Sequence, residues 1–201
     1  QDIVYIGNLT QGSKWKAFDI LFAGWAQAQQ KAKEQGYQEI QQSRLVVLGD
    51  GDPSKWQNYL KEKDCLESVV FTGRVDDVGP YLAKARLFLL PSRVEGLSNA
   101  LLEAMSWGLP VLVSDIPANQ AVVKHQVNGW VVPVNGSKAL AEAILYLLKE
   151  ETLCLQLGQA ARQTIEKEYT IERVTSRLIG LYDELLTRSS EKGSNNAKQA
   201  A

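Results

Sequence analysis

Short apolar runs alternate along the chain with longer segments in which apolar residues recur every three or four positions. Runs rich in Val, Ile and Leu occupy residues 3–9, 44–52, 68–73, 86–91, 109–115 and 129–133. Runs without polar alternation are typical of strands buried on both faces of a parallel sheet. The segments between them predict helices near residues 15–33, 54–63 and 76–85, which supply the crossovers that parallel strands require. The pattern therefore predicts an α/β fold, a Rossmann-like open parallel sheet with helices on both faces.

The C-terminal part of the chain changes character. Three segments with helical periodicity follow one another at residues 137–149, 151–167 and 171–188. From residue 189 to 201 the sequence is polar and has few apolar residues, so we expect this tail to be disordered. The predicted domain therefore covers residues 1–188.

Composition narrows the classes of partner. The chain has 201 residues, of which 45% are hydrophobic and 22% charged, with a formal net charge of −1. This balance gives no overall attraction to nucleic acid or to anionic membranes, so we expect no nucleic-acid partner. An anionic ligand must instead be held by local groups.

Cysteine, histidine and hydropathy patterns point to a cytoplasmic protein. Cys65 and Cys154 are far apart and show no metal-ligand spacing, so we expect reduced thiols in the core. The single histidine, His125, cannot form a histidine metal site alone, and we expect it on the surface. No apolar run reaches the ~20 residues of a membrane span, and no signal peptide is recognisable. The chain begins inside an apolar run without a methionine, which favours a piece of a longer polypeptide.

Glycines gather where the predicted strands end. Gly7, Gly49, Gly51, Gly73 and Gly96 all follow apolar runs. Any one of them is explained by a tight turn, but glycine also lets a ligand approach the backbone closely. In open parallel sheets, ligands bind at the carboxyl ends of the strands. The concentration of glycines at that edge therefore favours a binding site.

The segment VEGLSNALLEAM, residues 94–105, contains the most specific signal. Ser98 or Asn99 is a suitable N-cap for a helix. The backbone amides of Gly96, Leu97 and Ser98 would then lie at the positive end of the helix dipole. Such a helix N-terminus is a ready site for a phosphate or diphosphate.

Two carboxylates flank this predicted anion site, Glu95 before the helix and Glu103 inside it. Carboxylates accept hydrogen bonds from vicinal sugar hydroxyls, so one acid for each sugar of a nucleoside diphosphate sugar fits this spacing. Several alternatives stay open. Glu103 is equally explained as a solvated surface acid and Glu95 as a loop acid paired to Arg93. A glycosidase-type acid/base pair is a further possibility.

Two lysines precede the first long helix. Lys14 and Lys16 are candidates for cationic contacts to a diphosphate. Lysines near a helix start are otherwise ordinary solvated side chains.

Taken together, these motifs resemble one family. EGLSNALLEAMSWGLPVLVSD is similar to the E-x7-E signature of retaining glycosyltransferases of family 4, the glycosyl transferases group 1, which have the GT-B fold. The order of KAFD, LVVLGDGD, VVFTGRVDD, FLLPSRVEG and NGWVVP also resembles that family, from about residue 3 to residue 188. The resemblance implies that this chain is the C-terminal, nucleotide-sugar-binding half of a GT-B enzyme. The acceptor domain would then precede residue 1.

The resemblance implies roles by position. Glu95 would be the catalytic residue, contacting the donor's sugar hydroxyls near the reacting centre, and Glu103 would bind the ribose. Lys16 and Gly7 would lie at the phosphates. The remaining donor contacts would come from Gly96, Leu97 and Ser98 through backbone amides, and from the strand end Phe71 to Gly73 along the nucleobase.

The resemblance further implies a hexosyl transfer from a nucleoside diphosphate sugar to a hydroxyl acceptor, without a metal or other cofactor. Contact with membranes would come only through the missing N-terminal half. The helix after Tyr169 resembles the family's final helix, which returns toward that N-terminal domain. Three positions depart from the family pattern. Asn8 replaces the usual phosphate-binding arginine, Ala17 replaces a glycine, and two extra residues precede Lys16. These departures keep two alternatives open, a nucleotide-binding or structural domain without transferase activity and a GT-B sugar-nucleotide epimerase.

Overall fold

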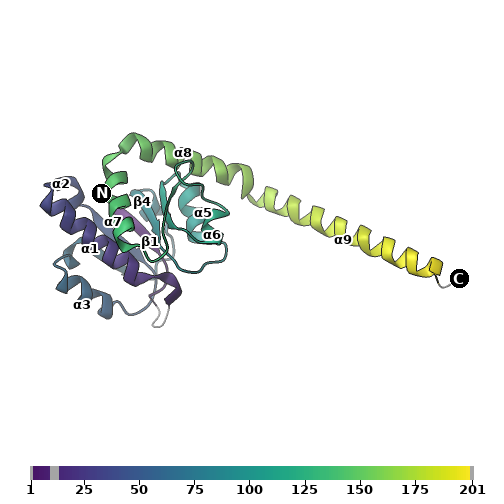
Figure 1. Cartoon of the computed structure of the whole chain (residues 1–201), viewed down its shortest axis with the longest axis horizontal. Coiled ribbons are helices and arrows are strands. Elements are labelled where there is room, and N and C mark those ends of the chain that lie inside the picture. The colour runs from purple at the N-terminus through teal and green to yellow at the C-terminus, as the bar shows by residue number, and fades with distance from the viewer. Residues whose placement is uncertain (1, 10–13, 200–201) are drawn as a thin grey trace. The chain divides into compact units, whose positions relative to one another are not determined.

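The computed structural model describes residues 2–9 and 14–199, with side chains as far as residue 186, and the fold is built on one parallel sheet (Figure 1). The strands are β1 (Asp2–Ile6), β2 (Arg44–Leu48), β3 (Val69–Gly73), β4 (Ala85–Leu90), β5 (Val111–Ser114) and β6 (Trp130–Val132). Their order in the sheet is β3-β2-β1-β4-β5-β6, and every neighbouring pair is parallel. The expected Rossmann-like α/β fold is confirmed.

Helices cover both faces of the sheet. Figure 1 shows α1 (Phe18–Glu34) and α7 (Ser137–Lys149) side by side on one face, with α5 (Asn99–Ser106) and α6 (Pro117–Gln120) on the other. The helix α3 (Ser54–Glu62) contacts α1. The remaining helical elements before residue 164 are η1 (Lys14–Lys16), α2 (Gln38–Gln41), η2 (Leu66–Ser68), α4 (Gly79–Leu82) and the first part of α8 (Glu151–Glu168).

The core lies between the sheet and its helices. Side chains of the central strands are fully buried, because both faces of the sheet are covered by helices; they include Ile3, Val4, Tyr5, Leu45, Val47, Leu87, Phe88, Leu89 and Leu90. On the α1 side, Phe22 contacts Trp56 of α3 at 5.1 Å and Phe71 of β3 at 5.7 Å between ring centroids. This cluster joins α1, α3 and β3 by burial of large aromatic surfaces.

The strands end earlier than the apolar runs predict. β1 ends at Ile6 and β2 at Leu48, and each run continues into a loop. Gly49 has a backbone φ of 150° and Gly51 one of 119°, values that residues with a side chain rarely adopt. A Cβ at Gly49 would lie 2.2 Å from the carbonyl oxygen of Gly7. Glycine therefore allows the two loops to pass each other closely where the strands stop.

Both cysteines are free and buried, as the sequence analysis expects. Burial, and to a smaller extent the charge of Asp64, raise the pKa of the Cys65 thiol to about 11. The thiol is therefore protonated near neutral pH. In the described part of the chain, no helix is long and apolar enough to cross a membrane.

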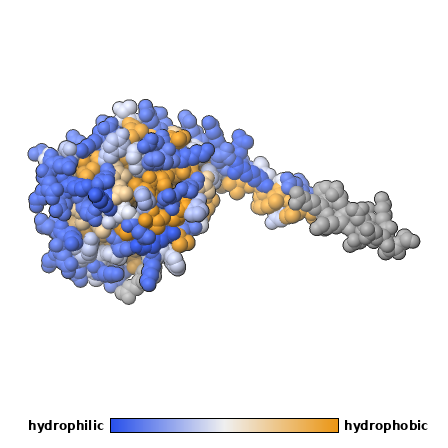
Figure 2. Space-filling model, in the orientation of Figure 1, coloured by the Kyte–Doolittle hydropathy of each residue, from blue (hydrophilic) through white to orange (hydrophobic). Residues whose placement is uncertain are grey.

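The chain divides into two compact units at residues 164 and 165. The second unit contains α9 (Ile171–Gln199), which continues through most of the segment predicted to be disordered from Ser189. No proline interrupts that segment, so the backbone can remain helical despite its polar composition. The described part of α9 exposes apolar side chains at helical spacing (Figure 2), namely Ile171, Val174, Leu178, Leu181, Tyr182 and Leu185.

Candidate functional site

The centre of the sheet contains the point at which the strand order reverses. β1 is followed by β2 on one side, whereas β4, its other neighbour, is followed by β5 on the opposite side. The loops leaving β1 and β4 therefore diverge, and a crevice at the carboxyl ends of the strands is the usual ligand site of such sheets. The loop after β4 and the described part of the loop after β1 contain most of the candidate residues.

Lys16 and Glu95 form the central ion pair of this edge. Lys16 Nζ lies 2.8 Å from Glu95 Oε1, although the two residues are 79 positions apart in sequence. The Lys16 side chain is 33% exposed and that of Glu95 only 10%. Ser92 Oγ donates a second hydrogen bond, of 2.7 Å, to the same carboxylate oxygen. A carboxylate that accepts from both an ammonium and a hydroxyl is held in one orientation.

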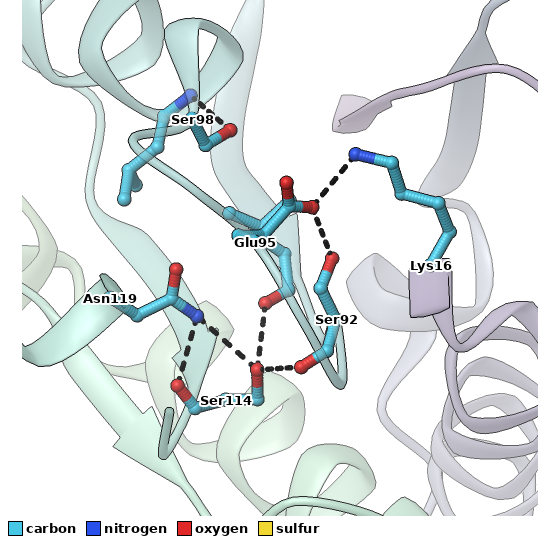
Figure 3. A network of polar contacts seen from close by, with 8 residues as sticks. Lys16, Ser92, Glu95, Ser98, Ser114 and Asn119 are labelled. Carbon is cyan, nitrogen blue, oxygen red and sulfur yellow. Dashed lines mark hydrogen bonds and ion pairs between the residues drawn. The ribbon is translucent and has the colours of Figure 1, made fainter. Parts of the chain in front are cut away.

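A chain of buried polar groups continues behind Ser92 (Figure 3). Ser114 Oγ, at the end of β5, donates to the carbonyl oxygen of Ser92. Asn119 Nδ2, on α6, donates to the carbonyl oxygen of Ser114 at 2.9 Å and to its hydroxyl oxygen at 3.2 Å. Ser92, Ser114 and Asn119 are all at most 1% exposed. Groups from the ends of β4 and β5 thus form one network that ends at Glu95.

Arg93 pairs with Asp19, and not with Glu95 as one reading of the sequence proposed. Its guanidinium nitrogens lie 2.8 and 2.7 Å from the two Asp19 carboxylate oxygens. The same side chain donates to the Lys14 carbonyl oxygen at 3.0 Å and to Asn135 Oδ1 at 2.5 Å. The short Arg93–Glu95 spacing did not decide the pairing, because the start of α1 presents Asp19 in bidentate geometry to Arg93.

The Asp19–Arg93 pair gives a prediction about acid stability. The hydrogen bonds from Arg93 are the main cause that lowers the pKa of Asp19 below its usual value. The stabilisation is therefore fully present above about pH 4, the unfolded pKa, and is lost as the pH falls through the lower folded value. We expect Asp19→Asn to reduce the free energy of unfolding at pH 6 and to have a vanishing effect in strong acid. Urea unfolding of both proteins across this range measures the difference, and a difference independent of pH would contradict the assignment.

The start of α5 matches the predicted helix N-terminus. Ser98 is the N-cap, and its hydroxyl oxygen accepts a hydrogen bond of 3.4 Å from the Leu101 amide. Gly96 and Leu97 precede it on the surface, and no atom lies within 4 Å of the position of a Cβ on Gly96. Glu103 lies on the exposed side of α5. The backbone before α5 is therefore accessible to a ligand, while Glu103 is accessible to solvent or ligand alike.

Gly7 lies directly above a buried hydroxyl. A Cβ at Gly7 would lie 2.6 Å from the Tyr5 hydroxyl oxygen, so the loop can pass here only without a side chain. Among the described residues this hydroxyl has no hydrogen-bond partner. Burial, and to a smaller extent the negative charge of Glu95, raise the pKa of Tyr5. The phenol therefore remains protonated beside the carboxylate.

Phe71 and Gly73 both belong to β3, but they lie in different surroundings. The Phe71 ring packs against Phe22 in the aromatic cluster, so its side chain does not line the ligand edge. Gly73, with φ of 69°, is at the strand end, and its carbonyl oxygen accepts from the Gly49 amide at 3.0 Å. Near this point a pocket of about 240 Å³ lies at the ends of β1, β2 and β3, lined by Ile6, Gly7, Asn8, Leu48, Gly49, Asp50, Arg74, Val75 and Val78.

Asn8 has a structural contact in place of a charge. Its side-chain oxygen accepts a hydrogen bond of 3.2 Å from the Asp50 amide, which joins the loops after β1 and β2. Ala17 has φ of 52°, in the left-handed region that favours glycine. Two of the three departures expected from the resemblance, Asn8 and Ala17, therefore fall at a loop contact and at the strained start of α1.

A larger pocket of about 680 Å³ lies elsewhere, between α1 and the amino ends of β2 and β3. Its lining includes Gln29, Lys33, Arg44, Asp64 and Ser68. Parallel sheets of this type bind ligands at the opposite, carboxyl edge. In the described part of the chain, no three His, Cys, Asp or Glu side chains gather as a metal site. We therefore take the carboxyl edge as the candidate site.

Sequence reasoning missed the buried members of this site. Ser114 and Asn119 attracted no role, although a serine ending an apolar run is a weak signal of a buried hydrogen-bonding group. Asp50 and Arg74 follow predicted strands and were expected at the ligand edge, but the sequence assigned them no specific role; both line the pocket there. These residues gain their place from the order of the strands, which local patterns do not contain.

Comparisons with known proteins agree with this picture. The family model described as "Glycosyl transferases group 1" matches residues 1–150. An uncharacterized glycosyltransferase of Haemophilus influenzae is 27% identical over 181 residues, covering 89% of this chain and 48% of the relative. The UDP-Gal:α-D-GlcNAc-diphosphoundecaprenol α-1,3-galactosyltransferase of Escherichia coli is 27% identical over 149 residues, covering 73% and 38%. The chain thus spans less than half the length of these relatives.

Solved structures of glycosyltransferases with the GT-B architecture share the fold. The structure of HepE from Anabaena in complex with UDP-glucose superposes with a TM-score of 0.77 at 19% identity, covering 91% of this chain and 48% of that chain. At this identity the likeness shows the fold alone. With the family model matching about three quarters of the sequence, the chain belongs to the glycosyl transferases group 1 family.

Proposed function

We propose that this chain is the donor-binding domain of a retaining, family 4 glycosyltransferase that uses the E-x7-E pair Glu95 and Glu103. The intact enzyme transfers a hexosyl group from a nucleoside diphosphate sugar to a hydroxyl acceptor. One observation carries the proposal. The Lys16–Glu95 pair joins the two diverging loops at the point where the strand order reverses, beside the accessible amides that precede α5.

In this proposal the diphosphate lies between Lys16 and the start of α5. An ammonium group has three donors, so the bond to Glu95 leaves two for phosphate oxygens. Gly96, Leu97 and Ser98 offer backbone amides at the positive end of the α5 dipole. These fixed groups stabilise the charge that develops on the diphosphate as it leaves.

The two acids take the sugars on either side of the diphosphate. Lys16 and Ser92 both contact Glu95 through Oε1, which leaves Oε2 to accept hydrogen bonds from the hexosyl hydroxyls. Glu103, one turn into α5 and exposed, accepts from the ribose. The nucleobase lies along the β3 end at Gly73, next to the pocket that contains Arg74. The acceptor hydroxyl then attacks the face from which the diphosphate departs.

We propose further that an N-terminal domain supplies the acceptor site. The chain spans less than half of its relatives, and in relatives named as transferases the match is confined to one part of the protein. The exposed apolar side chains of α9 support a partner domain, since large apolar patches on a surface mark interaction sites. This proposal makes the chain alone able to bind a donor but unable to transfer a sugar.

A second candidate is a nucleotide-binding or structural domain without transferase activity. The observation that favours it is Asn8, whose side chain is engaged by the Asp50 amide where the family has a cation for phosphate. Donor binding separates the two candidates.

The test is a calorimetric titration of the chain with UDP, GDP and ADP and with their common sugar conjugates. We expect one base to be preferred, because the relatives and solved structures include users of UDP-linked sugars. Glu103→Ala should lower the affinity for the preferred nucleotide by about 10-fold, the loss expected for one hydrogen bond to a charged group. Binding that is indifferent to Glu103 would contradict the ribose role. No binding by any nucleotide would favour the structural candidate.

A further inference from the structure

The peptide group between Ser92 and Arg93 is fixed at both ends. Its carbonyl oxygen accepts a hydrogen bond from Ser114 Oγ. Its amide, that of Arg93, donates to the Trp15 carbonyl oxygen at 2.7 Å. Trp15 is the neighbour of Lys16, so this one peptide group connects the end of β5, the loop of Glu95 and the segment of Lys16.

Asn119 determines the direction of the hydrogen bonds in this network. The Ser114 carbonyl oxygen can only accept, so the Asn119 amide must present Nδ2 to it. Nδ2 also donates to Ser114 Oγ, which leaves the Ser114 hydroxyl proton free to point at the Ser92 carbonyl oxygen. Every donor therefore points from Asn119 toward Ser92. Reversing the amide would place two acceptors against each other.

Burial makes this network rigid. Ser92, Ser114 and Asn119 are at most 1% exposed, so water does not compete for their hydrogen bonds. Ser92 then contributes twice, since its carbonyl oxygen is held by Ser114 and its own hydroxyl donates to Glu95 Oε1 at 2.7 Å. Figure 3 shows the groups arranged in this order from Asn119 to Lys16.

We propose that Ser114 and Asn119 are positioning residues that orient the Glu95 carboxylate toward the donor sugar by fixing the Ser92–Arg93 peptide. Neither residue contacts the donor in this proposal, which rests on the proposed donor-binding function. Their effect is on the additional affinity that the sugar contributes beyond the nucleotide. The affinity for the nucleotide itself depends on Lys16 and the α5 amides, so it changes little.

A double-mutant cycle with Ser114→Ala and Glu95→Ala tests this role. The measured quantity is the ratio of the dissociation constants of UDP and UDP-glucose, obtained by calorimetry. Ser114→Ala should lower this ratio by about 3- to 10-fold, the loss expected for one hydrogen bond. In the Glu95→Ala protein the same substitution should leave the ratio unchanged, because residues that act through one another are not additive. Equal effects in both backgrounds would overturn the proposal.

Ser43→Ala provides a matched control. Ser43 is 1% exposed and its hydroxyl donates to the Glu39 carbonyl oxygen at 2.9 Å, but it lies before β2 at the opposite edge of the sheet. Ser43→Ala removes the same atom as Ser114→Ala, the serine Oγ, from an equally buried position. A lowered ratio in this control would attribute the effect of Ser114 to general loss of packing, and would also overturn the proposal.

A second measurement needs no ligand. Amide hydrogen exchange at Arg93, followed by NMR, reports directly on the Ser92–Arg93 peptide. We expect faster exchange in Ser114→Ala and Asn119→Ala than in the wild type and in Ser43→Ala. Unchanged exchange would overturn the positioning role. If another base is preferred in the titration with UDP, GDP and ADP, the ratio is measured with that nucleotide and its sugar conjugate. If the wild type binds none of UDP, GDP, ADP and their sugar conjugates, the proposed function fails, and the exchange rates still decide whether the peptide is held as proposed.

Discussion

Lys16→Ala is expected to lower the affinity of the chain for UDP by about 10- to 100-fold, the loss that follows from removing charge-assisted hydrogen bonds to a diphosphate. Lys16 is partly exposed and pairs with Glu95 at the carboxyl edge of the sheet, where the proposal places the diphosphate. Asn8 carries no charge, and its side-chain oxygen accepts from the Asp50 amide. In the proposed site the phosphate charge therefore depends mainly on Lys16. Calorimetric titration with UDP measures the change.

Lys14→Ala is the matched control for this prediction. Lys14 belongs to the same short helix η1 and carries the same charge two positions away. Its carbonyl oxygen accepts from Arg93, a contact that the substitution leaves in place. We expect its effect on UDP affinity to stay within about twofold, since salt screens the charge of an exposed side chain that does not contact the ligand. Similar losses in the two variants would show that general positive charge, not the Lys16–Glu95 geometry, holds the nucleotide.

Gly158→Ala is expected to destabilise the unit formed by the residues before 165 by about 1–3 kcal/mol, the range found for overpacking of a close contact. Gly158 lies in α8, and a Cβ there would lie 2.0 Å from the Gly108 carbonyl oxygen. The helix cannot keep its distance from Gly108 without moving. Helix propensity alone predicts the opposite sign, because alanine is favoured over glycine by about 1 kcal/mol in a helix. Urea unfolding followed by tryptophan fluorescence measures the result.

Gly180→Ala separates the two contributions. Gly180 lies in α9, and no atom lies within 4 Å of the position of its Cβ. Only the helix propensity changes there, so we expect more helical signal in far-ultraviolet circular dichroism and no loss of stability. Stabilisation by both substitutions would contradict the close contact between α8 and the turn after α5.

The prediction for Gly158 could not have been made from the sequence alone. Gly158 sits in a segment whose apolar periodicity predicts a helix, and nothing in that pattern marks the position as a contact. The requirement for glycine comes from the carbonyl of Gly108, which is brought there by the packing of α8. Lys16, in contrast, was a candidate from its motif, but its partner was not known.

The sequence by itself determined the order of the strands along the chain, most of the longer helices and the class of the fold. Continuous apolar runs identified all six strands of the described sheet, because residues buried on both faces leave no polar alternation. Ser98 identified the start of α5, because an N-cap acts on amides within the same turn. The acid pair Glu95 and Glu103 and the strand-end glycines predict a nucleotide-sugar site, which stays a prediction. Each of these signals depends on neighbours a few positions apart.

The tertiary structure alone decided which groups meet. Arg93 pairs with Asp19 and leaves Glu95 to Lys16, and the Phe71 ring packs against Phe22 of α1. Ser114 contacts Ser92, the neighbour of Glu95 in this network, only because β5 lies beside β4 in the sheet. Such pairings depend on strand order and on the paths of loops between distant segments. Local propensity and periodicity contain no information about those distances. The pairing of these groups is therefore decided by the folded structure alone.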